Sequence, residues 1–166
     1  MGDFLRRGGE LKIIKALDLH HPKILEQLFE LQRTSYLIEA QLIGFYEIPP
    51  LKETVEELKV CGETFLGYFD GEYLAGAISY TVEEHELTIC RMVVHPSYFR
   101  KGIAQKLLIK MEEQNHAIPV LKVSTGKENS PAKNLYLKNG FKYVSDFEVM
   151  SGVLISHYKK EKHQLK

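Results

Sequence analysis

The segment from Val94 to Ala104, VHPSYFRKGIA, constrains the fold more than any other part of this chain. The residues before it, from Leu87 to Val94, are largely apolar, as in a buried strand. Pro96 then blocks further strand pairing, because proline has no N–H to donate. Apolar residues recur downstream at helical spacing, namely Ile103, Leu107, Leu108 and Met111. The segment therefore predicts a buried strand that turns directly into a helix.

The predicted turn carries two cations and a glycine, Arg100, Lys101 and Gly102. The first turn of a helix leaves about four backbone N–H groups without intrahelical partners, and the helix dipole is positive there. Solvated cations are the alternative interpretation, but the dipole makes this place unfavourable for them. A glycine lets the backbone approach a ligand closely. We therefore expect an anion such as a pyrophosphate to bind here.

A second informative segment, NSPAKNLYLKNGF, covers residues 129–141. Ser130 is expected to cap a helix that has Pro131 as its first residue. Gly140 is expected to end that helix. One face of the helix would carry Ala132, Leu135 and Tyr136.

Together these segments resemble the GCN5-related N-acetyltransferase (GNAT) superfamily. The first is similar to its acyl-CoA signature, (Gln/Arg)-x-x-Gly-x-(Gly/Ala), with Gly102 and Ala104 at the last two fixed positions. Phe99 stands at the first position and departs from the signature, while Arg100 beside it offers a cation. The second segment is similar to the later motif N-x-x-A-x-x-L-Y-x-x-x-G-F. The resemblance implies an acetyltransferase that uses acetyl-CoA.

The expected elements alternate between strands and helices in the order that this superfamily has. Strands are expected at 10–17, 64–69, 73–81, 85–94, 119–124, 142–150 and 153–159, and helices at 22–37, 51–60, 102–115 and 131–138, with a loop at 38–50. Such a mixture favours an α/β (α+β) fold with helices on both faces of a mostly antiparallel, twisted sheet. We expect a flexible leader at 1–9, a single domain at 10–160 and a polar tail at 161–166.

Composition narrows the possible partners. The 22 Lys and Arg residues balance the 22 Asp and Glu residues, which argues against binding nucleic acid broadly. No apolar stretch is long enough to span a membrane, and the first residues lack the apolar core of a signal peptide, so a cytoplasmic protein is expected. Cys61 and Cys90 are too few for a disulfide framework or a metal site, and no metal is expected. A homodimer is left open.

The resemblance also implies the residues of a cofactor site. The strand ending at Val94 would part from the strand beginning near Val120, and a main-chain N–H around Val93 or Val94 would stabilise the thioester oxygen. Asn129 would bond the pantetheine arm, and Tyr136 would donate a proton to the departing CoA thiolate. An ordinary core position is the alternative for Tyr136. The full expected set is Met92, Val93, Val94, Phe99, Arg100, Lys101, Gly102, Ile103, Ala104, Gln105, Asn129, Ala132 and Tyr136.

The acceptor amine must lose a proton, and the sequence does not single out a base for it. Many relatives place a glutamate on the strand before the signature, where this chain has Thr88. The nearby polar residues are Glu83, Glu84, His85, Glu86 and Arg91, with Glu39 a further candidate; spacing selects none of them.

The segment after the first helix is expected to form a wall of the acceptor site, since it does so in this superfamily. It holds Tyr36, Glu39, Phe45, Tyr46 and Glu47. Carboxylates beside aromatic rings suit a cationic amine. The alternative is that the rings belong to the core and the glutamates to a solvated face.

Two functions remain open at this stage. One is an N-acetyltransferase that acts on a small-molecule or peptide amine, which the motif residues Asn129 and Tyr136 favour. The other is a non-catalytic acyl-CoA sensor or interaction module, for which the departures at Phe99 and Thr88 leave room.

Overall fold

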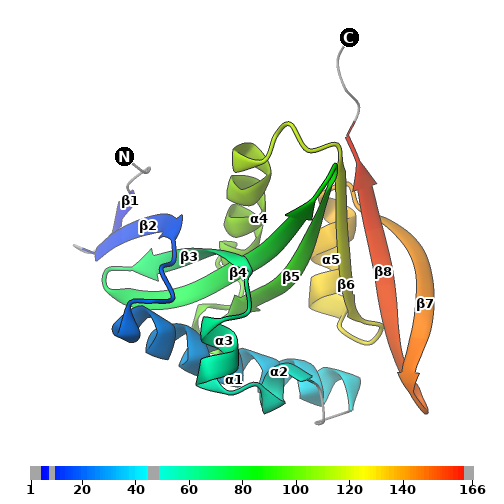
Figure 1. Ribbon diagram of the computed structural model, residues 1–166, viewed down its shortest axis with the longest axis horizontal. Coiled ribbons are helices and arrows are strands. Elements are labelled where there is room, and N and C mark those ends of the chain that lie inside the picture. Colours follow the sequence, from blue (N-terminus) through cyan, green and yellow to red (C-terminus); the bar gives the residue numbers. More distant parts are fainter. Residues whose placement is uncertain (1–4, 8–9, 45–48, 163–166) are drawn as a thin grey trace.

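The computed structural model describes residues 5–7, 10–44 and 49–162. Within these ranges the strands form one sheet in the order β1-β2-β3-β4-β5-β6-β8-β7 (Figure 1). The strands are β1 (Leu5–Arg7), β2 (Glu10–Ala16), β3 (Thr64–Asp70), β4 (Tyr73–Glu83), β5 (Glu86–Val94), β6 (Val120–Gly126), β7 (Lys142–Met150) and β8 (Val153–Glu161). The helices are α1 (Pro22–Ile43), α2 (Pro49–Lys52), α3 (Val55–Lys59), α4 (Ile103–Gln114) and α5 (Ser130–Lys138), with a 3-10 turn at Pro96–Tyr98.

Neighbouring strands are antiparallel except β5 and β6, which are parallel. The helix α4 connects these two strands, as a parallel crossover requires. The expected mixed and mostly antiparallel sheet is thus confirmed, and its strands lie close to the predicted positions.

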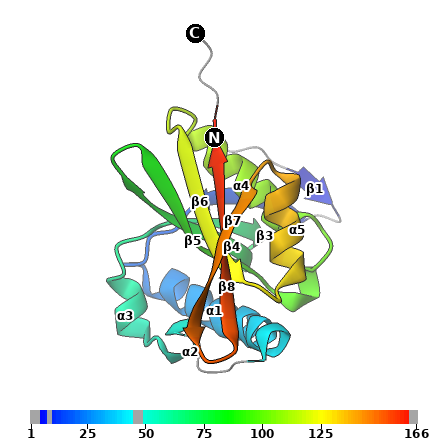
Figure 2. The ribbon, with the colours of Figure 1, turned by 90° about the vertical axis from the view of Figure 1, so that its right-hand side faces the viewer.

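Helices cover both faces of this sheet, as Figures 1 and 2 show. The face covered by α4 and α5, called the α4 face, packs residues such as Leu107, Met111 and Tyr136 against Leu121 and Val123 of β6. The opposite face, called the α1 face, packs α1 and α3 against β3, β4 and β5; its buried cluster holds Leu28, Leu58, Phe65, Ala77 and Val93. That cluster includes no described residue of β6, β7 or β8, so none of the described helices shares a buried core with this part of the α1 face.

The helix α1 runs further than its predicted end near Leu37. The buried stripe that starts at Leu25 continues through Tyr36 to Ala40, so burial favours further turns. Gly44 then ends the helix with a φ of 70°, and its N–H bonds to the carbonyl oxygen of Ala40. The prediction of a loop at 38–43 is therefore wrong; residues 45–48 lie outside the described ranges.

Two short helices replace the single helix predicted at 51–60. Thr54 interrupts the segment and caps α3, since its side chain accepts a hydrogen bond from the Glu57 N–H at 3.1 Å. The Glu57 carboxylate in turn accepts from the Thr54 N–H at 2.9 Å, which completes a capping box. The prediction missed this cap because Leu51 and Leu58 suggested one continuous apolar face.

Part of the expected leader belongs to the sheet. The three residues of β1 pair antiparallel with β2, from Leu5 opposite Lys12 to Arg7 opposite Glu10. The sheet therefore begins upstream of residue 10. No helix within the described ranges is both long and apolar enough to cross a membrane.

Candidate active site

The sheet opens between β5 and β6. The two strands pair from Glu86 opposite Val120 to Ile89 opposite Val123. Beyond these pairs β5 stays bonded to β4 as far as Val94, and β6 stays bonded to β8 as far as Gly126. Each strand therefore keeps its outer neighbour and loses its inner one, and the two backbones diverge (Figure 1). This is the divergence that the sequence predicts. The space between the unpaired ends of β5 and β6 is called the slot.

A β-bulge marks the place where the strands part. Tyr80 of β4 lies opposite Ile89, and the next residue, Ser79, lies opposite Arg91. Cys90 is thus the extra residue of β5. Because a bulge bends a strand and increases its twist, it gives a local cause for β5 turning away from β6 at this point.

Two helix N-termini lie at the open end of the slot. Because β5 and β6 are parallel, the segments that follow them, leading into α4 and α5, leave the sheet at the same edge. The first α-helical bond of α4 runs from the Lys106 N–H to the Gly102 carbonyl, and that of α5 from the Lys133 N–H to the Asn129 carbonyl. The N–H groups before these bonds, together with both helix dipoles, favour an anion at this edge.

The turn before α4 has an unusual backbone. Arg100 has a φ of 65° and Gly102 a φ of 75°, both in the left-handed region. A Cβ added to Gly102 would meet no atom within 4 Å, so the space in front of the helix is open. At Gly76 of β4, in contrast, a Cβ would lie 2.8 Å from Cγ2 of Ile103. The missing side chain at Gly76 therefore lets the first residue of α4 pack directly on the sheet.

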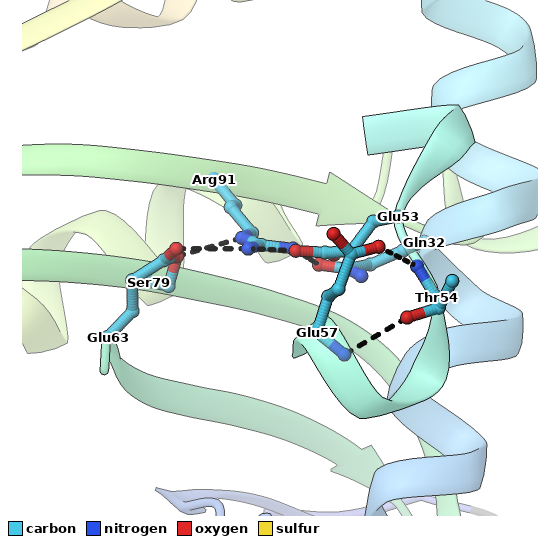
Figure 3. Close-up of polar contacts among 7 residues, drawn as sticks. All are labelled: Gln32, Glu53, Thr54, Glu57, Glu63, Ser79 and Arg91. Atoms are coloured by element: carbon cyan, nitrogen blue, oxygen red, sulfur yellow. Dashed lines mark hydrogen bonds and ion pairs between the residues drawn. The ribbon is translucent and has the colours of Figure 1, made fainter. Parts of the chain in front are cut away.

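A partly buried ion-pair network lies on the α1 face (Figure 3). Arg91, just after the bulge, donates from Nε and Nη2 to the Glu63 carboxylate at 2.8 and 2.9 Å. It also donates from Nη1 and Nη2 to the Glu53 carboxylate at 2.6 and 2.9 Å, and from Nη1 to Oε1 of Gln32 at 2.9 Å. Ser79 donates to Glu63 at 2.6 Å. The network thereby ties α1 and the segments flanking α3 to β4 and β5.

Arg91 and Glu63 hold each other in their charged forms. Burial alone lowers the pKa of Arg91, but its hydrogen bonds to Glu53 and Glu63 outweigh burial and raise it above its ordinary value. Burial likewise raises the pKa of Glu63, yet the hydrogen bonds from Arg91 and Ser79 leave it below its ordinary value. One guanidinium thus faces two carboxylates, and the charges sum to minus one.

A family model for the acetyltransferase (GNAT) family matches residues 25–141. The chain belongs to the GNAT family. A curated relative, UPF0157 protein YqkA of Bacillus subtilis (strain 168), is 37% identical over 144 residues, or 87% of this chain. The chain spans only 42% of the length of YqkA.

Solved structures of this fold agree closely. PaiA N-acetyltransferase from Thermoplasma acidophilum, in complex with coenzyme A, has a TM-score of 0.73 at 23% identity, covering 91% of this chain and 99% of that one. The ribosomal-protein-S18-alanine N-acetyltransferase from Escherichia coli has a TM-score of 0.74 at 14% identity, covering 93% and 96%. At these identities the likeness shows a shared fold.

The structure brings the two GNAT motifs to the same end of the slot. Residues 92–105 follow β5 into α4, and residues 129–136 follow β6 into α5. Gln105 is occupied by Asn139, since their side-chain amides exchange hydrogen bonds of 2.6 and 2.7 Å between α4 and α5. Phe99, which departs from the signature, is 46% exposed. Cofactor contacts of these residues stay a prediction.

Asn129 takes the capping role that was predicted for Ser130. Its Oδ1 accepts from the Ala132 N–H at 3.2 Å, and Ser130 is the first helical residue instead. Asparagine satisfies the same orphan N–H as serine, so sequence alone gave no reason to choose between the neighbours. With its oxygen in the cap, the side-chain NH2 of Asn129 is the group suited to a ligand carbonyl.

Tyr136 lies in the core of the α4 face and is 2% exposed. Its ring meets that of Phe141 edge-on at a centroid distance of 5.4 Å. Core packing, the alternative interpretation, is therefore observed. The expected role of its hydroxyl at the cofactor sulfur is compatible with this position in α5 and stays a prediction.

The acceptor-side candidates divide into three groups. Tyr36 is buried on the α1 face, close enough to Arg91 to contribute to its raised pKa. The side chain of Glu39 and residues 45–47, which include Phe45, Tyr46 and Glu47, lie outside the described part of the chain. The polar residues of 83–86 lie at the closed end of the slot, where β5 and β6 are still paired, and Glu86 bonds to Lys122 at 2.9 Å.

The sequence interpretation missed the partners of Arg91. An arginine among the apolar residues of 87–94 signals a buried charge that needs a partner. It does not identify that partner, because Gln32, Glu53 and Glu63 come from three different segments.

Replacing Arg91 with methionine should destabilise the fold by about 2–4 kcal/mol at pH 7, since it leaves two partly buried carboxylates without their cation. Glu63 has a lowered pKa in the fold, so its stabilisation is present above its ordinary pKa of about 4.3 and is lost as pH falls through the lowered value. The difference in free energy of unfolding between wild type and R91M should therefore become smaller at acidic pH. Urea unfolding at neutral and acidic pH measures this difference. Arg33→Met, at an exposed arginine, is the control. A difference of equal size at both pH values would contradict this account.

Proposed function

We propose that this chain transfers the acetyl group of acetyl-CoA to a primary amine of a small molecule or peptide. The observation that carries the proposal is the slot between β5 and β6, which leads to two helix N-termini. A pantetheine arm is an extended chain with amide groups, so it suits the place of a missing strand. The CoA complex of the structurally similar PaiA enzyme supports the same cofactor.

In this reaction the acceptor nitrogen forms a bond to the thioester carbon, and the carbon–sulfur bond breaks. Negative charge gathers first on the carbonyl oxygen, where a backbone N–H around Val93 or Val94 is suitably placed on the free edge of β5. It then passes to the CoA sulfur, to which Tyr136 would donate its phenolic proton. The nitrogen, which is cationic after the attack, loses one proton to water to give the amide, and the Tyr136 phenolate regains a proton from water.

The acceptor is expected to be a cation before it reacts. It would approach from the α1 face, because α4 and α5 occupy the other face with the cofactor end. There the network of Arg91 with Glu53 and Glu63 carries a net negative charge. Such a surface favours an ammonium group over a neutral or anionic acceptor.

A panel of primary amines and Lys-containing peptides tests the reaction, with acetyl-CoA turnover read as release of free thiol. We expect turnover that depends on the amine, with cationic alkylamines preferred over carboxylate-bearing ones. Binding of acetyl-CoA without turnover across the panel would contradict the proposal and favour a sensor.

Gly102→Val should weaken coenzyme A binding at least tenfold, about 1.4 kcal/mol, because its side chain projects into the open space before α4 where the pyrophosphate is expected. Calorimetry with coenzyme A measures the effect. Gly152→Val is the matched control: Gly152 has a φ of 80° and equally open surroundings, but lies in the β7–β8 turn. Equal affinities for the two variants would refute this placement of the pyrophosphate.

Tyr136→Phe should lower turnover about tenfold to a hundredfold while leaving acetyl-CoA affinity nearly intact, because it removes a proton donor and keeps the ring. The effect is modest for general acid catalysis, since a thiol of pKa about 8.5 leaves readily. Steady-state kinetics and calorimetry separate the two quantities. Tyr158→Phe, at another tyrosine buried in the same cluster, is the control. Lost affinity with normal turnover would mark Tyr136 as a packing residue only.

A further inference from the structure

A serine of β6, Ser124, lies on the α1 face at the point where β5 and β6 cease to pair, which is called the entrance to the slot. The last β5–β6 pair is Ile89 with Val123, so Ser124 is the first residue of β6 beyond the parting. Val123 packs on the α4 face, and alternation along the strand places Ser124 on the α1 face, where it is exposed. Continuing the register would put it opposite Cys90, the bulged and exposed residue of β5. Ser124 and Cys90 are therefore the two residues that flank the entrance.

A histidine on the next strand bonds to this serine. Ser124 pairs with His157 of β8 in the strand register, and Oγ of Ser124 lies 2.5 Å from Nδ1 of His157. The ring of Phe147 stacks on the imidazole, with centroids 4.4 Å apart and planes 14° apart. The imidazole is thus held in one orientation, on the part of the α1 face with which none of the described helices shares a buried core.

The charged groups that share this face are ordinary surface ions. Lys122 of β6 bonds to Glu86 at 2.9 Å, and Lys159 of β8 bonds to Glu161 at 3.1 Å. Lys142 of β7 lies opposite Lys159 in the register. Among ordinary side chains, imidazole is the one suited to exchanging a proton near neutral pH.

The carboxylates near the slot are poorly placed to take a proton from the acceptor. Glu63 accepts hydrogen bonds from Arg91 and Ser79, which hold it in its ionised form. Glu86 lies at the closed end of the slot and is paired with Lys122. Ser124 and His157 meet at the open end instead.

We propose that Ser124 and His157 form a proton relay that deprotonates the acceptor amine. This inference rests on the proposed acetyl transfer. Oγ of Ser124 accepts a proton from the ammonium nitrogen while its own hydroxyl proton passes to Nδ1 of His157. The imidazole, which carries its other proton on Nε2, becomes imidazolium, and the amine lone pair becomes free to attack the thioester carbon. After transfer His157 releases its proton to water and Ser124 regains its original state.

The relay is tested on the pH profile of kcat/KM, using the alkylamine with the highest turnover in the panel. His157→Gln and Ser124→Ala should each lower kcat/KM about tenfold to a hundredfold at pH 7. The loss in kcat/KM should become smaller as the pH rises toward the pKa of the amine, because a growing share of the amine is then already neutral and needs no relay. Calorimetry should show unchanged acetyl-CoA affinity in both variants.

Ser145→Ala is the matched control, since Ser145 lies opposite His157 on β7, on the side away from the slot. Its pH profile should match that of wild type. Variant profiles for His157 and Ser124 that coincide with wild type, or a deficit of equal size at every pH, would overturn the relay and leave acetyl transfer standing. An acetyl group found on Ser124 by mass spectrometry would also overturn it. Absence of turnover by wild type with every amine would remove both the transfer and the relay.

Discussion

The divergence of β5 from β6 after Ile89 and Val123 is the constraint on which the other features depend. A strand inside a sheet normally satisfies its backbone groups on both sides, so opening the sheet leaves donors and acceptors to be satisfied otherwise. The bulge at Cys90 turns β5 outward at the same point. The strands on either side remain paired, which confines the opening to a single gap. An extended ligand with amide groups can restore the lost bonds, and this explains why a sheet of this kind suits a pantetheine arm.

The opening also divides the chemistry between two faces. On the α4 face, backbone N–H groups and helix dipoles at the starts of α4 and α5 provide positive potential for phosphates. On the α1 face, Glu53 and Glu63 outnumber Arg91 and provide negative potential for an amine. Cofactor and acceptor would thus meet through the sheet, each drawn to the face of opposite charge. The acetyl group is the only part that must pass between them.

Local patterns predicted the parts of this architecture that are encoded locally. The strand-to-helix turn at 94–104 and the helix after Asn129 follow from proline, glycine and apolar spacing within one segment. The end of α1 was missed because Tyr36 and Ala40 extend its buried stripe, and burial depends on what the sheet presents. The Arg91 network and the Ser124–His157 pair could not be foreseen for a similar reason. Their members are far apart in the sequence, and only the register of the strands brings them together.

Gln105 of α4 and Asn139 at the end of α5 are joined by two hydrogen bonds between their uncharged side-chain amides. Added salt does not screen such a pair, whereas it weakens the ion pairs around Arg91 where water reaches them. The two sides of the site therefore respond differently to ionic strength. The contact between the first turn of α4 and the end of α5 therefore stays constant as salt is added. In the proposed reaction, added salt would reduce the attraction of a cationic amine to the α1 face and leave this contact between the helices intact.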